Sequence, residues 1–261
     1  MKKIILNSGL GLLTVFMLLS CHDGNNGETY VSYGVIQNVV SKSNYEILTD
    51  KGNTLIVTKS QTNQEIKNDK RVIVNFEILS DKGKSSKKYE VEVNGFYNLL
   101  SKPLVKESYI LLDETTRRDS IGNDPFCSIY AWFGGDYINI NFEMYYKESS
   151  GRKHLINLVY DDTNTSTDTL YLRLHQNAYG EVPAYNDMYL RRGEGRCSFK
   201  LSDILPAEVD EKPVKLVWKE YRSGLDVVEC ADTGVFRKGN YEEAAEKSST
   251  NTEFDDSLTV D

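Results

Sequence analysis

Residues 71–79 run Arg71-Val72-Ile73-Val74-Asn75-Phe76-Glu77-Ile78-Leu79, and this stretch decides the fold of the first part of the chain. Its even-numbered positions are purely apolar, whereas Asn75 and Glu77 stand on the other face. Side chains alternate between two faces along a β-strand, so this period of two predicts a strand with one buried face. An uninterrupted apolar face is what the interior of a small barrel requires.

Shorter runs with the same alternation surround this stretch. We expect them to form strands over residues 30–40, 45–49, 54–58 and 89–94, with a hairpin turn at Asp50-Lys51-Gly52-Asn53. A longer connection precedes residue 71. These features favour a small five-stranded OB-type β-barrel over residues 29–101, and an SH3-like barrel remains open as an alternative.

Residues 102–125 have a mixed pattern. They combine Pro103, the apolar run Ile110-Leu111-Leu112 and a charged run over 113–119, and they end in Gly122-Asn123-Asp124-Pro125. We interpret this segment as a connector that contains one short strand.

Longer alternating strands follow over residues 126–238. Six or seven of them, separated by polar turns, predict an antiparallel β-sandwich, so the expected fold class is all-β. The alternating apolar positions are Ile138, Ile140, Phe142 and Met144; Leu170, Leu172 and Leu174; Cys197, Phe199 and Leu201; and Val214, Leu216 and Trp218.

The N-terminus has the layout of a secretory signal. Lys2 and Lys3 precede an apolar run over 10–19 that is too short to span a bilayer comfortably. The sequence Leu18-Leu19-Ser20-Cys21 resembles the lipobox of bacterial lipoproteins, which implies a signal peptide over 1–20 and a lipid on Cys21; an ordinary signal and a short membrane helix are the alternatives. Residues 21–28 read as a flexible tether. We expect a location in the cell envelope, attached through this lipid and at the outer membrane, with the periplasmic or surface face left open.

The charge of the chain excludes one class of partner. The net charge is −8, and residues 239–261 are rich in acids and poor in apolar residues, which predicts a disordered acidic tail. An acidic protein repels phosphate backbones, so we expect no nucleic acid partner.

Cysteines and histidines give no reactive pattern. Apart from Cys21 the chain has Cys127, Cys197 and Cys230, which allow at most one disulfide among three pairings and match no metal spacing. No motif for a nucleophile elbow, a zinc helix or a phosphate loop occurs. His154 opens an apolar strand, and we interpret it as a hydrogen-bonded structural residue. We therefore expect no enzyme activity and no cofactor.

One loop has the spacing of a calcium site. Asp162, Asn164, Ser166 and Asp168 supply oxygen atoms at alternate positions, but Thr167 replaces the required glycine and Arg173 the final acid. A polar hairpin loop is the better interpretation, and no metal is expected.

The chain is rich in aromatic residues, with 17 Tyr, 9 Phe and 2 Trp. Tyr145 and Tyr171 fall opposite apolar stripes, so some tyrosines should be exposed. We expect a candidate ligand surface near Trp132, Tyr137 and Tyr185.

Taken together, the lipobox, the barrel and the sandwich resemble the NigD-like lipoproteins of a Gram-negative phylum of gut and oral anaerobes. The likeness is carried by residues 71–78, 122–125, 137–140 and 154–158. It implies an N-terminal OB domain and a C-terminal β-sandwich, with a suggested role in bacteriocin immunity and with no catalytic residues. Three tripeptides also resemble the Asp-Ser/Thr-aliphatic acceptor of exported O-glycoproteins of that phylum, which makes Ser120, Thr169 and Ser257 candidate glycosylation sites.

Two functions fit these observations. The first is a non-enzymatic, lipid-anchored envelope protein that binds a macromolecular partner, with immunity or envelope defence as one version. The second is a glycan-binding accessory lipoprotein at the cell surface.

Overall fold

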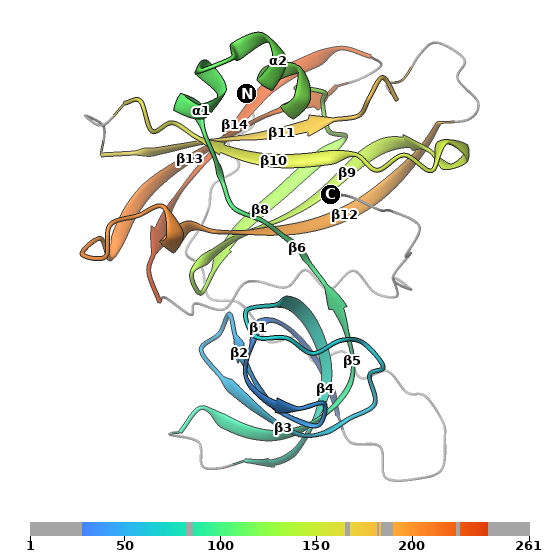
Figure 1. Cartoon of the computed structure of the whole chain (residues 1–261), viewed down its shortest axis with the longest axis vertical. Coiled ribbons are helices and arrows are strands. Elements are labelled where there is room, and N and C mark those ends of the chain that lie inside the picture. Colours follow the sequence, from blue (N-terminus) through green and yellow to red (C-terminus); the bar gives the residue numbers. More distant parts are fainter. Residues whose placement is uncertain are drawn as a thin grey trace. The chain divides into compact units, whose positions relative to one another are not determined.

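The computed structural model describes residues 28–81, 86–164, 168–181, 183, 190–222 and 225–239. The chain divides into two compact units between Leu99 and Leu100. The first contains a closed barrel and the second a pair of sheets (Figure 1). The predicted all-β fold, a small barrel followed by a β-sandwich, is therefore confirmed.

Five strands form the barrel. Their order is β1-β2-β3-β5-β4, and β1 pairs with β4 to close it. All pairs are antiparallel except β3–β5, an arrangement that fits the OB type. The strands are β1 (Thr29–Ser41), β2 (Asn44–Thr49), β3 (Thr54–Ser60), β4 (Arg71–Asp81) and β5 (Lys88–Asn98).

The interior of the barrel is apolar, and β4 contributes to it as the alternation predicted, with one exception. Val72, Val74 and Phe76 are buried in the barrel core. Ile78 is not in the core and is 37% exposed, so the prediction is wrong there. The β4–β5 ladder is irregular on both sides of this residue, and the end of β4 extends beyond the closed part of the barrel.

A buried ion pair joins β4 to the β2–β3 turn. The guanidinium of Arg71 donates to both carboxylate oxygens of Asp50, at 2.6 and 2.5 Å, and both side chains are buried. The ring of Tyr33 lies 5.8 Å from the guanidinium carbon. Asp50 therefore does more than form a turn: it neutralises a buried cation.

Two sheets form the sandwich. One has the order β14-β13-β11-β10-β7 and the other β6-β12-β9-β8. The long ladders are antiparallel, and the β7–β10, β11–β13 and β6–β12 pairs are parallel. The strands are β6 (Leu100–Ser101), β7 (Val105–Lys106), β8 (Ser128–Gly134), β9 (Tyr137–Lys147), β10 (Leu155–Tyr160), β11 (Leu170–Asn177), β12 (Leu190–Lys200), β13 (Glu211–Tyr221) and β14 (Val227–Arg237), with short 3-10 turns η1 (Glu148–Ser150) and η2 (Leu201–Asp203).

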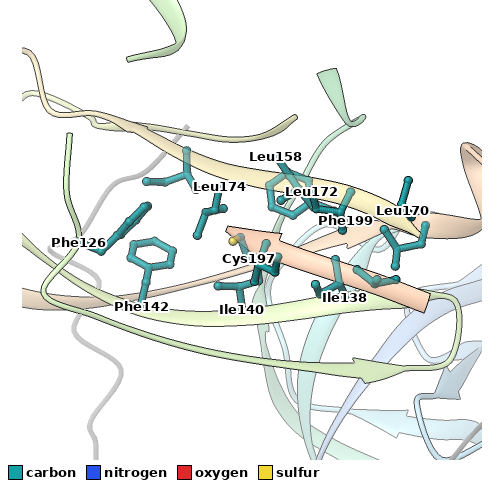
Figure 2. Close-up of a cluster of buried hydrophobic side chains, with 14 of the residues drawn as sticks. Phe126, Ile138, Ile140, Phe142, Leu158, Leu170, Leu172, Leu174, Cys197 and Phe199 are labelled. Atoms are coloured by element: carbon teal, nitrogen blue, oxygen red, sulfur yellow. The ribbon is translucent and has the colours of Figure 1, made fainter. Parts of the chain in front are cut away.

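The core of the sandwich lies between the inner faces of the two sheets (Figure 2). The alternating side chains of β9 and β12 pack there against those of β10 and β11. Phe126 and Phe142 meet edge to face, with ring centroids 5.5 Å apart. Burial of these side chains is the main source of stability for this unit.

Residues 102–125 differ from the expected connector with one strand. They contain β7 and two helices, α1 (Glu107–Leu111) and α2 (Glu114–Ile121). Ile110 and Ile121 are buried, whereas Leu111 and Leu112 are exposed, so the apolar run is split between two sides of a helix. Among the described residues, no helix is long and apolar enough to cross a membrane.

Candidate functional site

The two helices form a hairpin on the outer face of the five-stranded sheet (Figure 1). Their attachment is a small apolar cluster, separate from the main core, of Ile110, Ile121 and Val159, with Val105 packed against it. Such a small cluster cannot fix two short helices alone. Hydrogen bonds from distant residues hold both ends of the hairpin.

Asp162 holds the start of α1. One of its carboxylate oxygens accepts from the backbone N–H of Ser108 at 2.8 Å, and the other accepts from the Ser108 hydroxyl at 2.5 Å. Partial burial raises the pKa of Asp162, but these hydrogen bonds outweigh that effect and lower it overall. The carboxylate satisfies a free N–H in the first turn of the helix, as a capping residue does. Both oxygens of the first residue of the calcium-like loop are thus engaged in holding a helix.

Asn177 and Gly122 hold the end of α2. The side-chain amide of Asn177 donates to the carbonyl oxygens of Asp119 and Ser120, at 2.9 and 3.0 Å. Gly122 follows the helix with a positive φ of 77°. A Cβ atom at this position would lie 2.5 Å from the Cα of Asn177, so only glycine fits.

His175 lies beneath this helix end. Its Nδ1 donates to the carbonyl oxygen of Gly122 at 2.9 Å, and the ring is almost completely buried. Burial lowers the pKa of His175 from 6.5 to about 4, against the opposing effect of the hydrogen bond to Gly122. The imidazole is therefore neutral at physiological pH and supports the hairpin as a hydrogen-bond donor.

The tip of the hairpin exposes three large apolar side chains. Leu112 is 79% exposed, and Tyr109 and Leu111 are about half exposed. The guanidinium of Arg117 stacks on the Tyr109 ring at 3.9 Å and donates to the Tyr109 carbonyl. The tyrosine is thus held in one position while it faces solvent. Fixed tyrosine and arginine side chains beside a cluster of exposed apolar residues are typical of a protein-binding surface.

This surface was not predicted from the sequence. A local signal was present: Glu114 and Arg118 stand four positions apart and form an ion pair at 2.7 Å, a spacing that indicates a helix. The preceding apolar run, Ile110-Leu111-Leu112, favoured a connector with one short strand, so no helix was predicted here. The prediction did not include the exposed residues of this surface, which are Tyr109, Leu111, Leu112 and Arg117.

The predicted aromatic surface is only partly assembled. Trp132 lies beside Tyr130, with ring centroids 5.4 Å apart, and Tyr130 is half exposed. Tyr137 is on the neighbouring strand β9 but is 9% exposed, so it offers little contact area. Tyr185 lies outside the described residues.

Two other tyrosines were expected on the outer faces of the sheets. Tyr171 is exposed, as predicted. Tyr145 is half-buried and packs edge to face against Tyr221.

His154 is a buried structural residue, as its position in the sequence predicted. Its Nε2 lies 3.1 Å from a carboxylate oxygen of Glu181, and its Nδ1 lies 2.9 Å from the amide nitrogen of Gln176. The same Glu181 oxygen accepts from the backbone N–H of Lys147 at 2.7 Å. Both atoms of the imidazole that could act in proton transfer are engaged inside the fold.

The three cysteines of the described chain are free thiols. Burial raises the pKa of Cys127 to about 11 and also raises the pKa of Cys197 and of Cys230. Such thiols stay protonated at neutral pH and are poor nucleophiles.

The remaining candidate sites are the calcium-like loop, the glycosylation sites and the lipidation site, and only part of them lies within the described residues. Within the described residues, no group of His, Cys, Asp and Glu is arranged to hold a metal ion, and Ser166 of the calcium-like loop lies outside them. Ser120 is exposed on α2, and Thr169 is half-buried just before β11. Cys21 and Ser257 lie outside the described residues.

Comparisons with known proteins agree with this architecture. The model of the NigD-like N-terminal OB domain matches residues 33–99, and that of the NigD-like C-terminal beta sandwich domain matches residues 108–231. A search of curated proteins found no match.

Two solved structures illustrate the likeness. A NigD-like immunity protein from Bacteroides caccae is 21% identical, with a TM-score of 0.59 over 77% of this chain and 91% of that one. A protein of unknown function from Bacteroides vulgatus is 20% identical, with a TM-score of 0.58 over 80% of this chain and 90% of that one. At these identities the likeness shows the fold alone.

Proposed function

This chain belongs to the NigD-like family, and from that premise we propose that it is a non-enzymatic binding protein of the cell envelope. Its sandwich domain binds a macromolecular partner, and the lipid on Cys21 attaches it to the membrane, at the outer membrane. In the immunity or defence version of this role, the partner is a secreted protein toxin, since a solved relative is named an immunity protein.

The exposed tip of the helical hairpin carries this proposal. Leu112 is 79% exposed although Asp162, Asn177 and His175 fix the hairpin beneath it. A rigid apolar protrusion loses little conformational entropy on binding, so more of its buried area contributes to affinity. A partner with an apolar pocket therefore fits this surface.

The non-enzymatic part of the proposal is supported by the state of the reactive groups. The thiol of Cys127 is protonated at neutral pH, and the imidazoles of His154 and His175 are buried and hydrogen-bonded. These groups lack the pairing of nucleophile and base that group transfer requires.

Site-specific photo-crosslinking in intact cells tests the proposal. A photoreactive residue at position 112 should capture a protein identifiable by mass spectrometry, and one at the equally apolar position Leu225 should not. Leu225 is the matched control because it is half exposed but lies in the turn before β14. The substitution Leu111→Ser in the labelled chain should abolish capture with an unchanged melting temperature. Equal capture from both positions, or none from position 112, would refute the assignment.

Glycan binding is the second candidate, and one observation favours it. Tyr130 is half exposed beside Trp132, with the rings 5.4 Å apart and tilted by 31°. Adjacent aromatic rings on a sheet surface can stack on sugar rings. Affinity electrophoresis in gels that contain polysaccharide should then show retardation of the chain that Tyr130→Ala removes, and equal mobility of the two proteins would exclude this surface.

A further inference from the structure

We propose that the barrel docks directly on the lipid surface through one end, where β1 begins and β4 ends. The contact surface comprises Tyr30, Val31, Ile78 and Leu79, which we call the apolar mouth. The inference rests on the lipid anchor at Cys21 of the proposed function and adds a second, apolar contact with the same bilayer.

Two residues of the apolar mouth extend the barrel interior to the surface. Tyr30 pairs with Phe76 across the β1–β4 ladder, and their rings stack with centroids 5.8 Å apart. Ile78 pairs with Val91, which is fully buried in the barrel core. Because paired residues share a face, Tyr30 and Ile78 continue the inner face beyond the closed part of the barrel, where each is more than a third exposed.

The other two residues are Val31, on the outer face of the same end, and Leu79, at an irregularity of the ladder. Val31 is 47% exposed and pairs with Asn75, on the outer face of β4. Leu79 is 45% exposed and stands where the β4–β5 ladder shifts register between Ile78 and Ser80. Leu79 lies four residues beyond Asn75, the partner of Val31, which is about 13 Å along β4, so all four exposed apolar side chains lie at this end of the barrel.

The anchor places this end of the barrel close to the membrane. Eight residue steps separate Cys21 from Thr29, the first residue of β1, which limits the distance between them to about 29 Å. Thr29 pairs with Glu77, next to Ile78, so the tether enters the barrel at the apolar mouth. Val40 lies near the other end of β1 and is 76% exposed.

The chemistry of this end favours apolar insertion over charge attraction. The acids near it are Glu28, Glu77 and Asp81, and the cations are Lys87 and Lys88 at the start of β5, with Lys82 and Lys84 following β4 in the sequence. The hydroxyl of Tyr30 donates to Glu28 at 2.5 Å. Charges of both signs at this end offset one another and give no clear attraction to anionic headgroups, whereas tyrosine and aliphatic side chains suit the interface of a zwitterionic bilayer.

Quenching by spin-labelled lipid tests the docking. The lipidated chain is reconstituted in phosphatidylcholine vesicles with and without a doxyl-labelled phosphatidylcholine, and the fluorescence of Leu79→Trp is compared with that of Val40→Trp after subtraction of the parent signal. We expect at least twofold stronger quenching for Leu79→Trp, unchanged in 1 M NaCl. Val31→Trp is the second reporter from the same end and should behave like Leu79→Trp.

The outcomes separate the two proposals. If the parent chain floats with the vesicles but positions 79, 31 and 40 are quenched equally, the docking is wrong and the anchor stands. If the difference disappears in 1 M NaCl, the contact is electrostatic and the apolar mechanism is wrong. If the parent chain fails to float, the lipid anchor is wrong and the docking falls with it.

Discussion

Replacement of His175 by asparagine should make the stability of the sandwich less sensitive to acid. The imidazole is buried under the end of α2 and donates to Gly122, and its pKa is lowered from 6.5 to about 4. Asparagine keeps an N–H group that can reach the same carbonyl but does not titrate. The variant therefore removes one proton-binding site and leaves the other ionisable groups unchanged.

The expected effect follows from the protons bound in each state. Above pH 6.5 the imidazole is neutral in both the folded and the unfolded chain, and its contribution to stability is complete. Below pH 6.5 the unfolded chain binds a proton that the folded chain excludes, so the free energy of unfolding falls. The loss continues until the pH falls through about 4, where the folded chain also binds the proton. The difference between these two pKa values corresponds to a total loss of about 3 kcal/mol.

The assay follows the sandwich alone. Both tryptophans, Trp132 and Trp218, lie on sandwich strands, so urea unfolding monitored by tryptophan fluorescence reports on that unit. Between pH 7 and pH 4, the wild type should lose about 3 kcal/mol more stability than His175→Asn. Parallel curves for the two proteins would refute the assignment of a neutral, buried imidazole.

Three further substitutions test other parts of the structure. Asp50→Ala should destabilise the barrel by about 3 kcal/mol or more, because it removes the carboxylate that holds the buried guanidinium of Arg71. Urea unfolding followed by far-ultraviolet circular dichroism measures this loss, and an unchanged unfolding midpoint would contradict the prediction. Gly122→Ala should cost at least about 2 kcal/mol, since φ is positive and the new Cβ meets the backbone at Asn177, and a melting temperature within a degree of the wild type would show that the helix end relaxes freely. Asp162→Ala should cost about 1 kcal/mol through loss of the α1 cap. Calcium should leave the melting temperature of both the wild type and Asp162→Ala unchanged. A calcium-dependent rise in the melting temperature of the wild type alone would support a calcium site in this loop.

Alternation along the chain was enough to predict most of the long strands, because it is a local property, although β8 (Ser128–Gly134) was not predicted. In β9 the apolar side chains Ile138, Ile140, Phe142 and Met144 point to one face, and burial of that face follows directly. Ile78 marks the limit of this reasoning. Its place in the alternation is correct, but whether a position is inside the barrel depends on where the partner strands end.

Contacts between distant residues were not predictable in the same way. Asp50 belongs to a stretch whose composition predicts a turn, yet its side chain binds Arg71, 21 positions away. Asp162 resembled a calcium ligand, yet it holds α1 through Ser108, 54 positions away. Nothing near either residue in the sequence indicates these partners.

The helical hairpin was not predicted, because distant residues hold it in place. Its exposed side chains bear on its function. Its conformation depends on Asp162, Asn177 and His175, all far along the chain, and its exposed side chains add little to the folded core. Single exposed apolar residues are normal on a protein surface, but Leu112, Leu111 and Tyr109 are neighbours on one fixed protrusion. The free energy from burying them is not gained when the chain folds, so it is available only when a second molecule covers the tip. The proposed binding role accounts for this exposed cluster, so position 112 is the one to cross-link.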